Sequence, residues 1–272
     1  MLKKLLITGI LLTAVICFVQ SGKVADAFSA AKTDNSVFVQ KTPVMVELFT
    51  SESCASCPPA EKMLAKLERE QPFAEAELIT LAFHVDYRDG FGWKDKYASP
   101  LFTQRQKVYD RKFRTGYIYT PQMVVDGDIE FTGSNEKKAE KAVEKSLKNK
   151  KAEIGLSFDK DGKLNVKISK VPEHSDATIY LAVAEDGINT RVRGGENSGK
   201  DLSHVSLVRS LNGLGRITSA QNSFEVEKNL YFEPDWKKEN LRIVVFVQEN
   251  GSRNILGVGR ISPEITSENR NL

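Results

Sequence analysis

The sequence predicts an α/β fold followed by a mostly β C-terminal region of the β-sandwich type. Two observations lead to this prediction. Residues 44–150 alternate between apolar runs of strand length and amphipathic runs of helix length, a pattern typical of α/β proteins. Residues 151–262 contain short alternating runs separated by turn signals such as Asp161-Gly162 and Asn250-Gly251. The length of 272 residues suffices for one large domain or two ordinary ones.

Residues 1–27 have the pattern of a signal peptide. A pair of lysines precedes the apolar stretch 5–19, which is too short for a comfortable membrane span. Ala25-Asp26-Ala27 offers small residues at the two positions that a signal peptidase reads. We therefore expect a periplasmic or secreted bacterial protein with no stable membrane span after cleavage. An uncleaved anchor is the alternative. Residues 28–43 are polar and are expected to form a flexible leader.

The first structural element is expected to be a buried strand over 44–50. A helix over 60–71 and a near-continuous apolar run over 77–86 follow it, and the apolar run indicates a buried parallel strand. The helix is predicted because its apolar residues recur at helical spacing. Those residues are Met63, Leu64 and Leu67.

Proline and glycine mark the elements of the next segment. Pro100 suits the first turn of a helix, and Asp126-Gly127-Asp128 is a hairpin signal between two apolar runs. Ser134 is the expected N-cap of the helix that follows. The predicted elements are a helix over 100–113, strands over 121–125 and 129–132, and a helix over 134–149.

The C-terminal region is expected to consist of short strands. Strand-like alternation and turn residues at regular spacing favour a β-sandwich here. The polar, glycine-containing loop 193–204 interrupts this pattern, and the tail 263–272 is polar and expected to be frayed. The predicted strands are 154–158, 163–169, 178–184, 205–211, 223–226, 241–248 and 255–261.

Two cysteines at Cys-x-x-Cys spacing carry the clearest chemical signal. Cys54 and Cys57 lie between the first strand and the first helix, and signal-peptide cleavage would remove Cys17 and leave them as the only cysteines. A bridge this short closes too small a loop to stabilise a fold, so we expect a chemical role. Exchange of their disulfide with protein or small-molecule thiols is the expected reaction, with Cys54 attacking and Cys57 resolving.

The two prolines after Cys57 modify this expectation. Pro58 and Pro59 disfavour helical angles in the residues that precede them, so the helix is expected to start around Pro59. The thiols would then lie in a loop with little help from the helix dipole, and Glu47 and Glu52 would oppose a thiolate. A dithiol of modest acidity follows from this arrangement.

The order of elements over residues 44–150 resembles the thioredoxin fold. The segments CASCPP, HVDY, YTPQMVVDG and GEN…LSH…LVR are similar to a bacterial family of exported thioredoxin-like proteins classed as a domain of unknown function. The resemblance implies a thioredoxin-like fold with a C-terminal extension, and it implies no known reaction. It also implies a cis-proline, Pro121, facing the dithiol, and a role for loop 193–204 at the domain interface. Arg88 departs from the family pattern, in which an aromatic is usual.

Two further residues are expected near the dithiol. The second strand should lie beside the first, and parallel strands end at the same sheet edge, so His84 and Asp86 should approach the cysteines. His84 could tune thiol protonation or be a core histidine, and Asp86 could orient His84 or cap the following loop. The candidate catalytic residues are therefore Cys54, Cys57, Pro121, His84 and Asp86.

Two other functions remain open from the sequence. The first is a copper-binding thioredoxin-like chaperone in which Cys54, Cys57 and His84 provide a soft ligand set. The second is a non-catalytic binding module with an inert disulfide. Exchange requires no cofactor, and its partners would be protein thiols or disulfides. The net charge of +3 without a basic stripe argues against nucleic acid as a partner.

Overall fold

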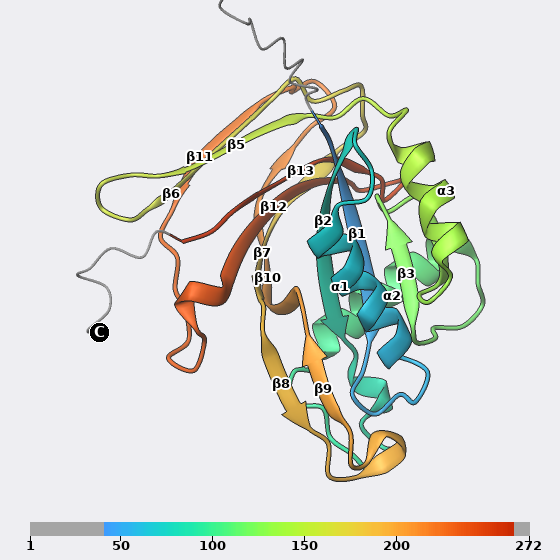
Figure 1. The fold of residues 1–272 in the computed structure, drawn as a ribbon. Coiled ribbons are helices and arrows are strands. Elements are labelled where there is room, and N and C mark those ends of the chain that lie inside the picture. Colours follow the sequence, from blue (N-terminus) through green and yellow to red (C-terminus); the bar gives the residue numbers. More distant parts are fainter. Residues whose placement is uncertain (1–40, 264–272) are drawn as a thin grey trace, which may run out of the picture. The chain divides into compact units, whose positions relative to one another are not determined.

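The computed structural model describes residues 41–263, which contain three helices and thirteen strands (Figure 1). The predicted signal peptide, most of the predicted leader and most of the predicted tail lie outside the described residues. The helices are α1 (Pro58–Glu70), α2 (Pro100–Phe113) and α3 (Glu136–Ser146). The strands are β1 (Thr42–Thr50), β2 (Ala76–His84), β3 (Gln122–Val125), β4 (Ile129–Thr132), β5 (Glu153–Phe158), β6 (Leu164–Ser169), β7 (Ala177–Glu185), β8 (Ile188–Arg191), β9 (Asp201–His204), β10 (Leu207–Ile217), β11 (Phe224–Lys228), β12 (Leu241–Glu249) and β13 (Ile255–Ile261).

One mixed sheet of eight strands dominates the fold, in the order β13-β12-β7-β10-β2-β1-β3-β4. The predicted fold class is therefore wrong. The protein is mostly β, and it is not a thioredoxin-like α/β fold followed by a separate β region. Strands from the C-terminal half extend the sheet begun by β1 and β2, because β10 joins β2 in parallel with Leu207 opposite Ala82. The apolar run of β2 predicted burial correctly, but it did not reveal which strand lies beside it.

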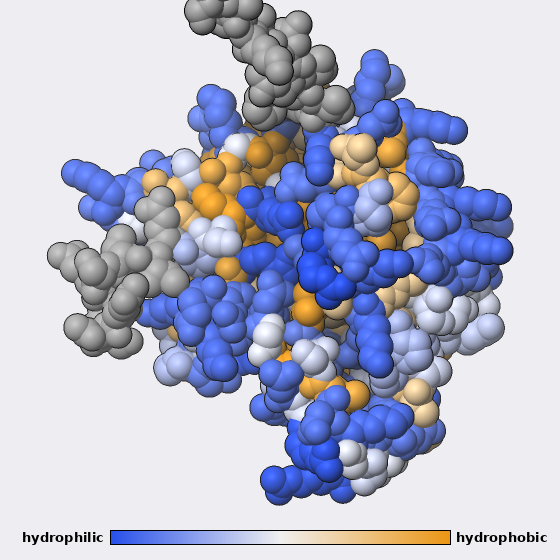
Figure 2. All heavy atoms as spheres, viewed as in Figure 1, coloured by the Kyte–Doolittle hydropathy of each residue, from blue (hydrophilic) through white to orange (hydrophobic). Residues whose placement is uncertain are grey.

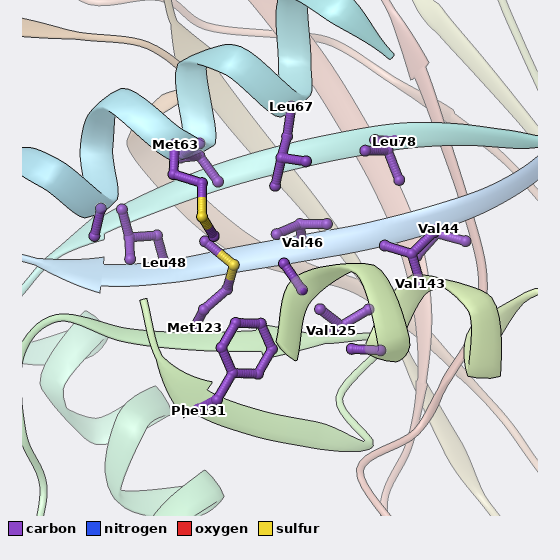
Figure 3. Packing of buried hydrophobic residues seen from close by; sticks show 14 of the residues in the cluster. Val44, Val46, Leu48, Met63, Leu67, Leu78, Met123, Val125, Phe131 and Val143 are labelled. Atoms are coloured by element: carbon purple, nitrogen blue, oxygen red, sulfur yellow. The ribbon is translucent and has the colours of Figure 1, made fainter. Parts of the chain in front are cut away.

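Alternating side chains of β1 pack into two different hydrophobic cores, one on each face of the sheet. One face of the strand packs against α1 and α3, in the cluster that Figure 3 shows around Met63, Met123 and Phe131. The other face packs against α2, where Phe49 contacts Phe83 and Tyr109 at ring-centroid distances of 5.5 and 5.9 Å. The middle of β1 and β2 is thus buried on both faces, which explains the near-continuous apolar runs of these two strands.

A second sheet, of three strands in the order β11-β6-β5, completes the C-terminal half. Its apolar side chains share a core with those of β7 and β12 that point toward it. Along β12 the two faces alternate strictly: Ile243, Val245 and Val247 belong to this core, whereas Val244 and Phe246 belong to the core under α2. The short hairpin of β8 and β9 forms a third, two-stranded sheet.

Two of the three helices, α1 and α3, start one or two residues away from the predicted positions. Helix α1 begins at Pro58, so the cysteines adjoin it more closely than expected, and Cys57 is its N-cap. Helix α3 is capped by Asn135 in place of Ser134, because the Asn135 side chain accepts a hydrogen bond from the Lys138 N–H at 3.1 Å. None of the helices in residues 41–263 is long and apolar enough to cross a membrane.

The face of the molecule in Figure 2 is mainly polar and charged, and its apolar side chains are gathered in separate patches. Large apolar side chains that stand out to solvent are few among the described residues: Phe91, Leu101, Tyr117 and Tyr231. Most of the apolar side chains are therefore buried in the three cores. The disulfide and the buried polar residues around His84 lie at the carboxyl ends of β1 and β2.

Candidate functional site

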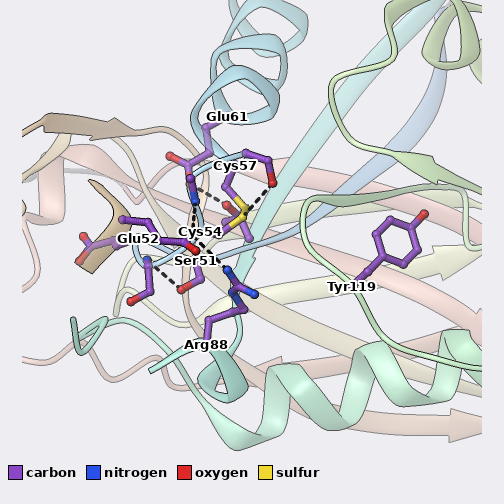
Figure 4. The surroundings of a disulfide bond; sticks show 12 residues. Ser51, Glu52, Cys54, Cys57, Glu61, Arg88 and Tyr119 are labelled. Atoms are coloured by element: carbon purple, nitrogen blue, oxygen red, sulfur yellow. Dashed lines mark hydrogen bonds and ion pairs between the residues drawn. A yellow bond between two sulfur atoms is a disulfide. The ribbon is translucent and has the colours of Figure 1, made fainter. Parts of the chain in front are cut away.

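Cys54 and Cys57 form a disulfide at the carboxyl end of β1, with their Cα atoms 5.4 Å apart (Figure 4). Cys54 lies in the loop after β1, which ends at Thr50, and Cys57 is the N-cap of α1. Both are buried, with 1% and 0% of their surface exposed, although Ala55 and Ser56 between them are exposed. The disulfide therefore lies just under the surface, at the junction of strand and helix.

The start of α1 can stabilise a thiolate on the cysteines only to a limited extent. Pro58 and Pro59 have no backbone N–H, and the N–H groups of Ala60 and Glu61 donate to the Cys57 carbonyl at 2.9 and 3.1 Å. The positive end of the helix dipole remains to favour a thiolate. The modest thiol acidity stays a prediction. The first turn of the helix is close to the sulfur atoms, but its N–H groups are absent or already used.

A buried cluster of charged residues lies beside the disulfide, and we call it the histidine cluster. His204 lies between two carboxylates, with Nε2 3.1 Å from Glu52 Oε1 and Nδ1 3.0 Å from Glu61 Oε2. His84 pairs through Nδ1 with Asp95 Oδ2 at 2.6 Å. The two imidazole rings lie edge to face with centroids 4.9 Å apart. The five residues come from different segments: Glu52, Glu61, His84, Asp95 and His204.

The histidine cluster is set up to hold positive charge. Burial alone would lower the pKa of His204, but its hydrogen bonds to Glu52 and Glu61 raise it to about 10. Burial would raise the pKa of Asp95, but the charge and hydrogen bond of His84 and two backbone N–H groups lower it to about 2. Burial also opposes ionisation of Glu61, and His204 outweighs it and lowers the pKa of that carboxyl.

Residues 192–200, which we call the covering segment, close over the Cys-x-x-Cys turn. Asn197 is fully buried, and its Nδ2 donates to the carbonyls of Glu52 and Cys54 at 2.8 and 3.0 Å. Glu196 Oε2 accepts from the Ala55 N–H at 2.9 Å and pairs with Arg88 at 3.3 Å. The covering segment therefore binds the backbone of the disulfide loop through several directed hydrogen bonds.

The family model described as "Protein of unknown function (DUF1223)" matches residues 45–248. The chain belongs to this family. The resemblance to a family classed as a domain of unknown function is thereby confirmed, and its thioredoxin-like character is not. No curated protein matches the chain.

Solved structures show the same fold in one relative. A crystal structure of a protein from Agrobacterium tumefaciens has a TM-score of 0.66 and 23% identity, and the match covers 84% of this chain and 97% of that chain. Bacteroides uniformis β-glucuronidase matches with a TM-score of only 0.19 and 12% identity, over 40% of this chain and 12% of that chain, so the two do not share a fold. The bacterial relative therefore supports the architecture of this member of the family and leaves its chemistry open.

The structure places His84, Asp86 and Pro121, the predicted site residues other than the cysteines, in three different surroundings. His84 ends β2 and belongs to the histidine cluster, at the carboxyl end of the sheet strands where it was expected. Asp86 instead faces α2, where its carboxylate accepts from the Thr103 hydroxyl at 2.5 Å and its N–H donates to that oxygen at 3.2 Å. Asp86 thus ties the loop after β2 to the start of α2, as its alternative capping role implied.

Pro121 is buried at the start of β3, and its bond with Thr120 is cis. Gly133 lies between this proline and the first turn of α1, since a Cβ on Gly133 would stand 3.2 Å from Pro121 and 3.0 Å from Ala60. The proline therefore lies at the same end of the sheet as the disulfide. A catalytic role for Pro121 or Asp86 stays a prediction.

The sequence did not single out Glu61, Asp95, His204 or Asn197 as site residues. A weak signal was available, because the chain has only 3 histidines and one of them ends the glycine-containing loop. The copper alternative stays a prediction, but the geometry groups His84 differently. The cysteines are bonded to each other, and His84 lies with Glu61 and His204.

Proposed function

We propose that the protein is an exported thiol–disulfide oxidoreductase that exchanges its Cys54–Cys57 disulfide with thiols or disulfides of a partner. One observation carries this proposal: the disulfide lies where β1 ends and α1 begins, directly beside a buried set of proton-binding groups. Helix N-termini favour thiolates, and thiolates are the attacking species in exchange. The position thus suits reversible chemistry at sulfur.

A structural role explains the bond poorly. The cysteines are only 3 apart in sequence, so the bridge removes little conformational freedom from the unfolded chain. The loop that carries both cysteines is already held at each end by β1 and α1, which belong to a packed core. Keeping two cysteines here is better accounted for by reactivity.

The exchange can be written in two balanced steps. The Cys54 thiolate attacks one sulfur of the partner disulfide, which forms a mixed disulfide and releases the partner's first thiolate. The Cys57 thiolate then attacks Cys54 Sγ, which closes the protein disulfide and releases the second thiolate. The partner gains two electrons, and the protein loses them. The steps run in reverse when the partner is a dithiol.

The disulfide needs an opening step, because neither cysteine is accessible in the closed arrangement. The covering segment is the element that must move, since Asn197 and Glu196 bind the backbone on both sides of Cys54. It contacts the disulfide loop through hydrogen bonds and packs through Gly194 against the loop at Gly92, and neither contact involves a strand of the large sheet. The covering segment can therefore open without disturbing that sheet.

Replacing Cys57 with serine should trap the partner. We expect C57S to accumulate mixed disulfides through Cys54 in the native compartment, because no second thiol can release the partner. We expect C54S to accumulate few. Non-reducing gels followed by mass spectrometry of the trapped species measure both.

The double variant C54S/C57S is the matched control, and it should trap nothing. If C57S and C54S trap partners equally, the assignment of attacking and resolving cysteine is wrong. If neither traps a partner under conditions in which the wild-type disulfide is reduced, the binding-module alternative replaces exchange.

Replacing Gly194 with alanine should speed up reduction of the disulfide. A Cβ at this position would stand 2.4 Å from the carbonyl oxygen of Gly92, so the covering segment cannot close against the loop that carries Trp93. Overpacking of this kind costs about 1–3 kcal/mol, which corresponds to an open fraction about 5–150-fold larger. The rate of reduction by a small phosphine, followed by thiol labelling, measures it.

Gly90 provides the matched control, since it lies in the same loop and a Cβ there meets nothing within 4 Å. G90A should be reduced at the wild-type rate. An unchanged rate in G194A, with the wild-type unfolding midpoint, would show that the covering segment does not control access.

A further inference from the structure

Three side chains of the histidine cluster have the spacing of metal ligands. Glu61, His84 and His204 each place one ligand atom within 4.8 Å of the others. They come from α1, β2 and β9, so three separate elements converge on one point. Both histidines are buried, and Glu61 is partly buried.

His84 has one nitrogen without a partner. Its Nε2 is buried and accepts or donates no hydrogen bond, whereas Nδ1 pairs with Asp95 at 2.6 Å. With Nδ1 facing Asp95, Nε2 is the nitrogen of His84 that a metal ion would use. A buried polar nitrogen without a partner is costly, and a ligand at Nε2 would remove that cost.

The other two side chains are held in ligating orientations in the same way. Glu52 accepts from His204 Nε2 at 3.1 Å, which presents His204 Nδ1 to Glu61, and Glu52 is itself fixed by the Trp93 indole N–H at 2.8 Å. Glu61 Oε1 accepts from the Thr50 hydroxyl at 2.7 Å, which leaves Oε2 toward His204. Metal-binding histidines and carboxylates commonly have such partners behind them.

We propose that Glu61, His84 and His204 bind a divalent transition-metal ion of the zinc type. Two imidazoles and one carboxylate suit Zn²⁺, which binds such ligands at about 2.0–2.2 Å in tetrahedral geometry. Ligand atoms on one such ion are about 3.3 Å apart, and Glu61 Oε2 and His204 Nδ1 are 3.0 Å apart. The three ligand atoms lie within 4.8 Å of one another, so His84 must approach the other two by up to about 1.5 Å to complete the set.

The charges around this point favour a cation. The carboxylates of Glu52, Glu61 and Asp95 surround two imidazoles in the protein interior. A divalent ion bound between them would replace the proton that His204 shares with Glu61, and the three carboxylates would offset the charge of the ion. The three ligands leave one coordination position open, and the ion would be held on the α1 side of the disulfide.

This site goes beyond the proposed exchange reaction and does not depend on it. Neither cysteine is a ligand, so the oxidised protein should bind the ion fully. The copper set of Cys54, Cys57 and His84 would instead require reduced thiols. The two can therefore be separated by the redox state of the protein.

Competition for Zn²⁺ against a chromophoric chelator tests the proposal with the oxidised protein. We expect one equivalent to bind to the wild type and equally to C54S/C57S. E61Q and H84Q should each bind at least tenfold more weakly, and D95N about 10–100-fold more weakly, the usual effect of removing a ligand's partner. H174Q is the control, since His174 contacts Pro172, away from the cluster, and it should bind like the wild type.

Cobalt substitution gives a second readout that does not rely on variants. The Co²⁺ complex of the oxidised protein should show tetrahedral ligand-field bands with no thiolate charge-transfer band. Absence of binding to the folded wild type would overturn the proposal. So would binding that E61Q and H84Q leave unchanged while both stay folded by circular dichroism, or binding that appears only after the disulfide is reduced.

Discussion

Replacing Arg105 with leucine should lower the free energy of unfolding by about 3–5 kcal/mol. Arg105 lies on α2 and is buried beneath the large sheet, where its Nε is 2.5 Å from Glu47 Oε1. Its NH1 donates to Gln248 of β12 at 3.0 Å and its NH2 to the Tyr109 hydroxyl at 3.1 Å. Leucine would leave the Glu47 carboxylate fully buried without its cation, and this uncompensated charge is the main cost.

Urea unfolding of R105L and the wild type measures the difference. R111L is the matched control, because Arg111 lies on the exposed side of the same helix and its replacement should change stability by less than about 0.5 kcal/mol. The double variant E47L/R105L should recover much of the loss, because no charge is then stranded. A loss in R105L no larger than in R111L would show that the pair is not needed.

Local patterns predicted the individual elements well where burial and periodicity agree. Helix α2 has the predicted bounds, Pro100–Phe113, because its proline start and amphipathic pattern coincide. Strand β13 also has the predicted bounds, Ile255–Ile261. Strands β8 and β9 were missed, because their buried positions include Thr190 and His204, which read as polar in a search for apolar alternation.

The fold class could not be predicted because it depends on a long-range pairing. Strand β2 is apolar on both faces whether it lies at the edge of a small sheet or inside a large one. Only the parallel contact of Leu207 with Ala82 decides between these, and those residues are 125 apart in the numbering. Nothing in the local sequence of β10 specifies β2 as its neighbour.

Only part of the candidate site could be predicted, because the rest also depends on long-range strand pairing. Sheet geometry placed His84 beside the dithiol, since parallel strands β1 and β2 end together with Thr50 opposite His84. His204 reaches the same point because it lies three residues before Leu207, which pairs with Ala82 of β2 in the long-range contact described above. Glu61 looked like an ordinary charged residue of α1, and only the arrival of His204 gives it a partner.

A chain that ends after residue 151 should fail to fold cooperatively. This result would show that the predicted domains 44–150 and 151–262 are not independent folding units. The core under α2 is shared across this boundary. Met45, Phe49 and Phe83 from the first half pack in one cluster with Val208 and Phe246 from the second. Removing the second half would expose that face of the sheet and the β2 edge together, and an exposed apolar edge strand promotes aggregation.

Residues 41–151 and 41–263 form a matched pair for this test, because they share a start and differ only in the C-terminal half. Near-UV circular dichroism and urea unfolding should give a native spectrum and a single transition for 41–263 and neither for 41–151. The shorter chain also lacks β12 and therefore the Arg105–Gln248 hydrogen bond, which destabilises it further. A cooperative transition in 41–151 would mean that β1, β2 and the three helices form a core sufficient by itself, with the remaining strands added to a fold that is already complete.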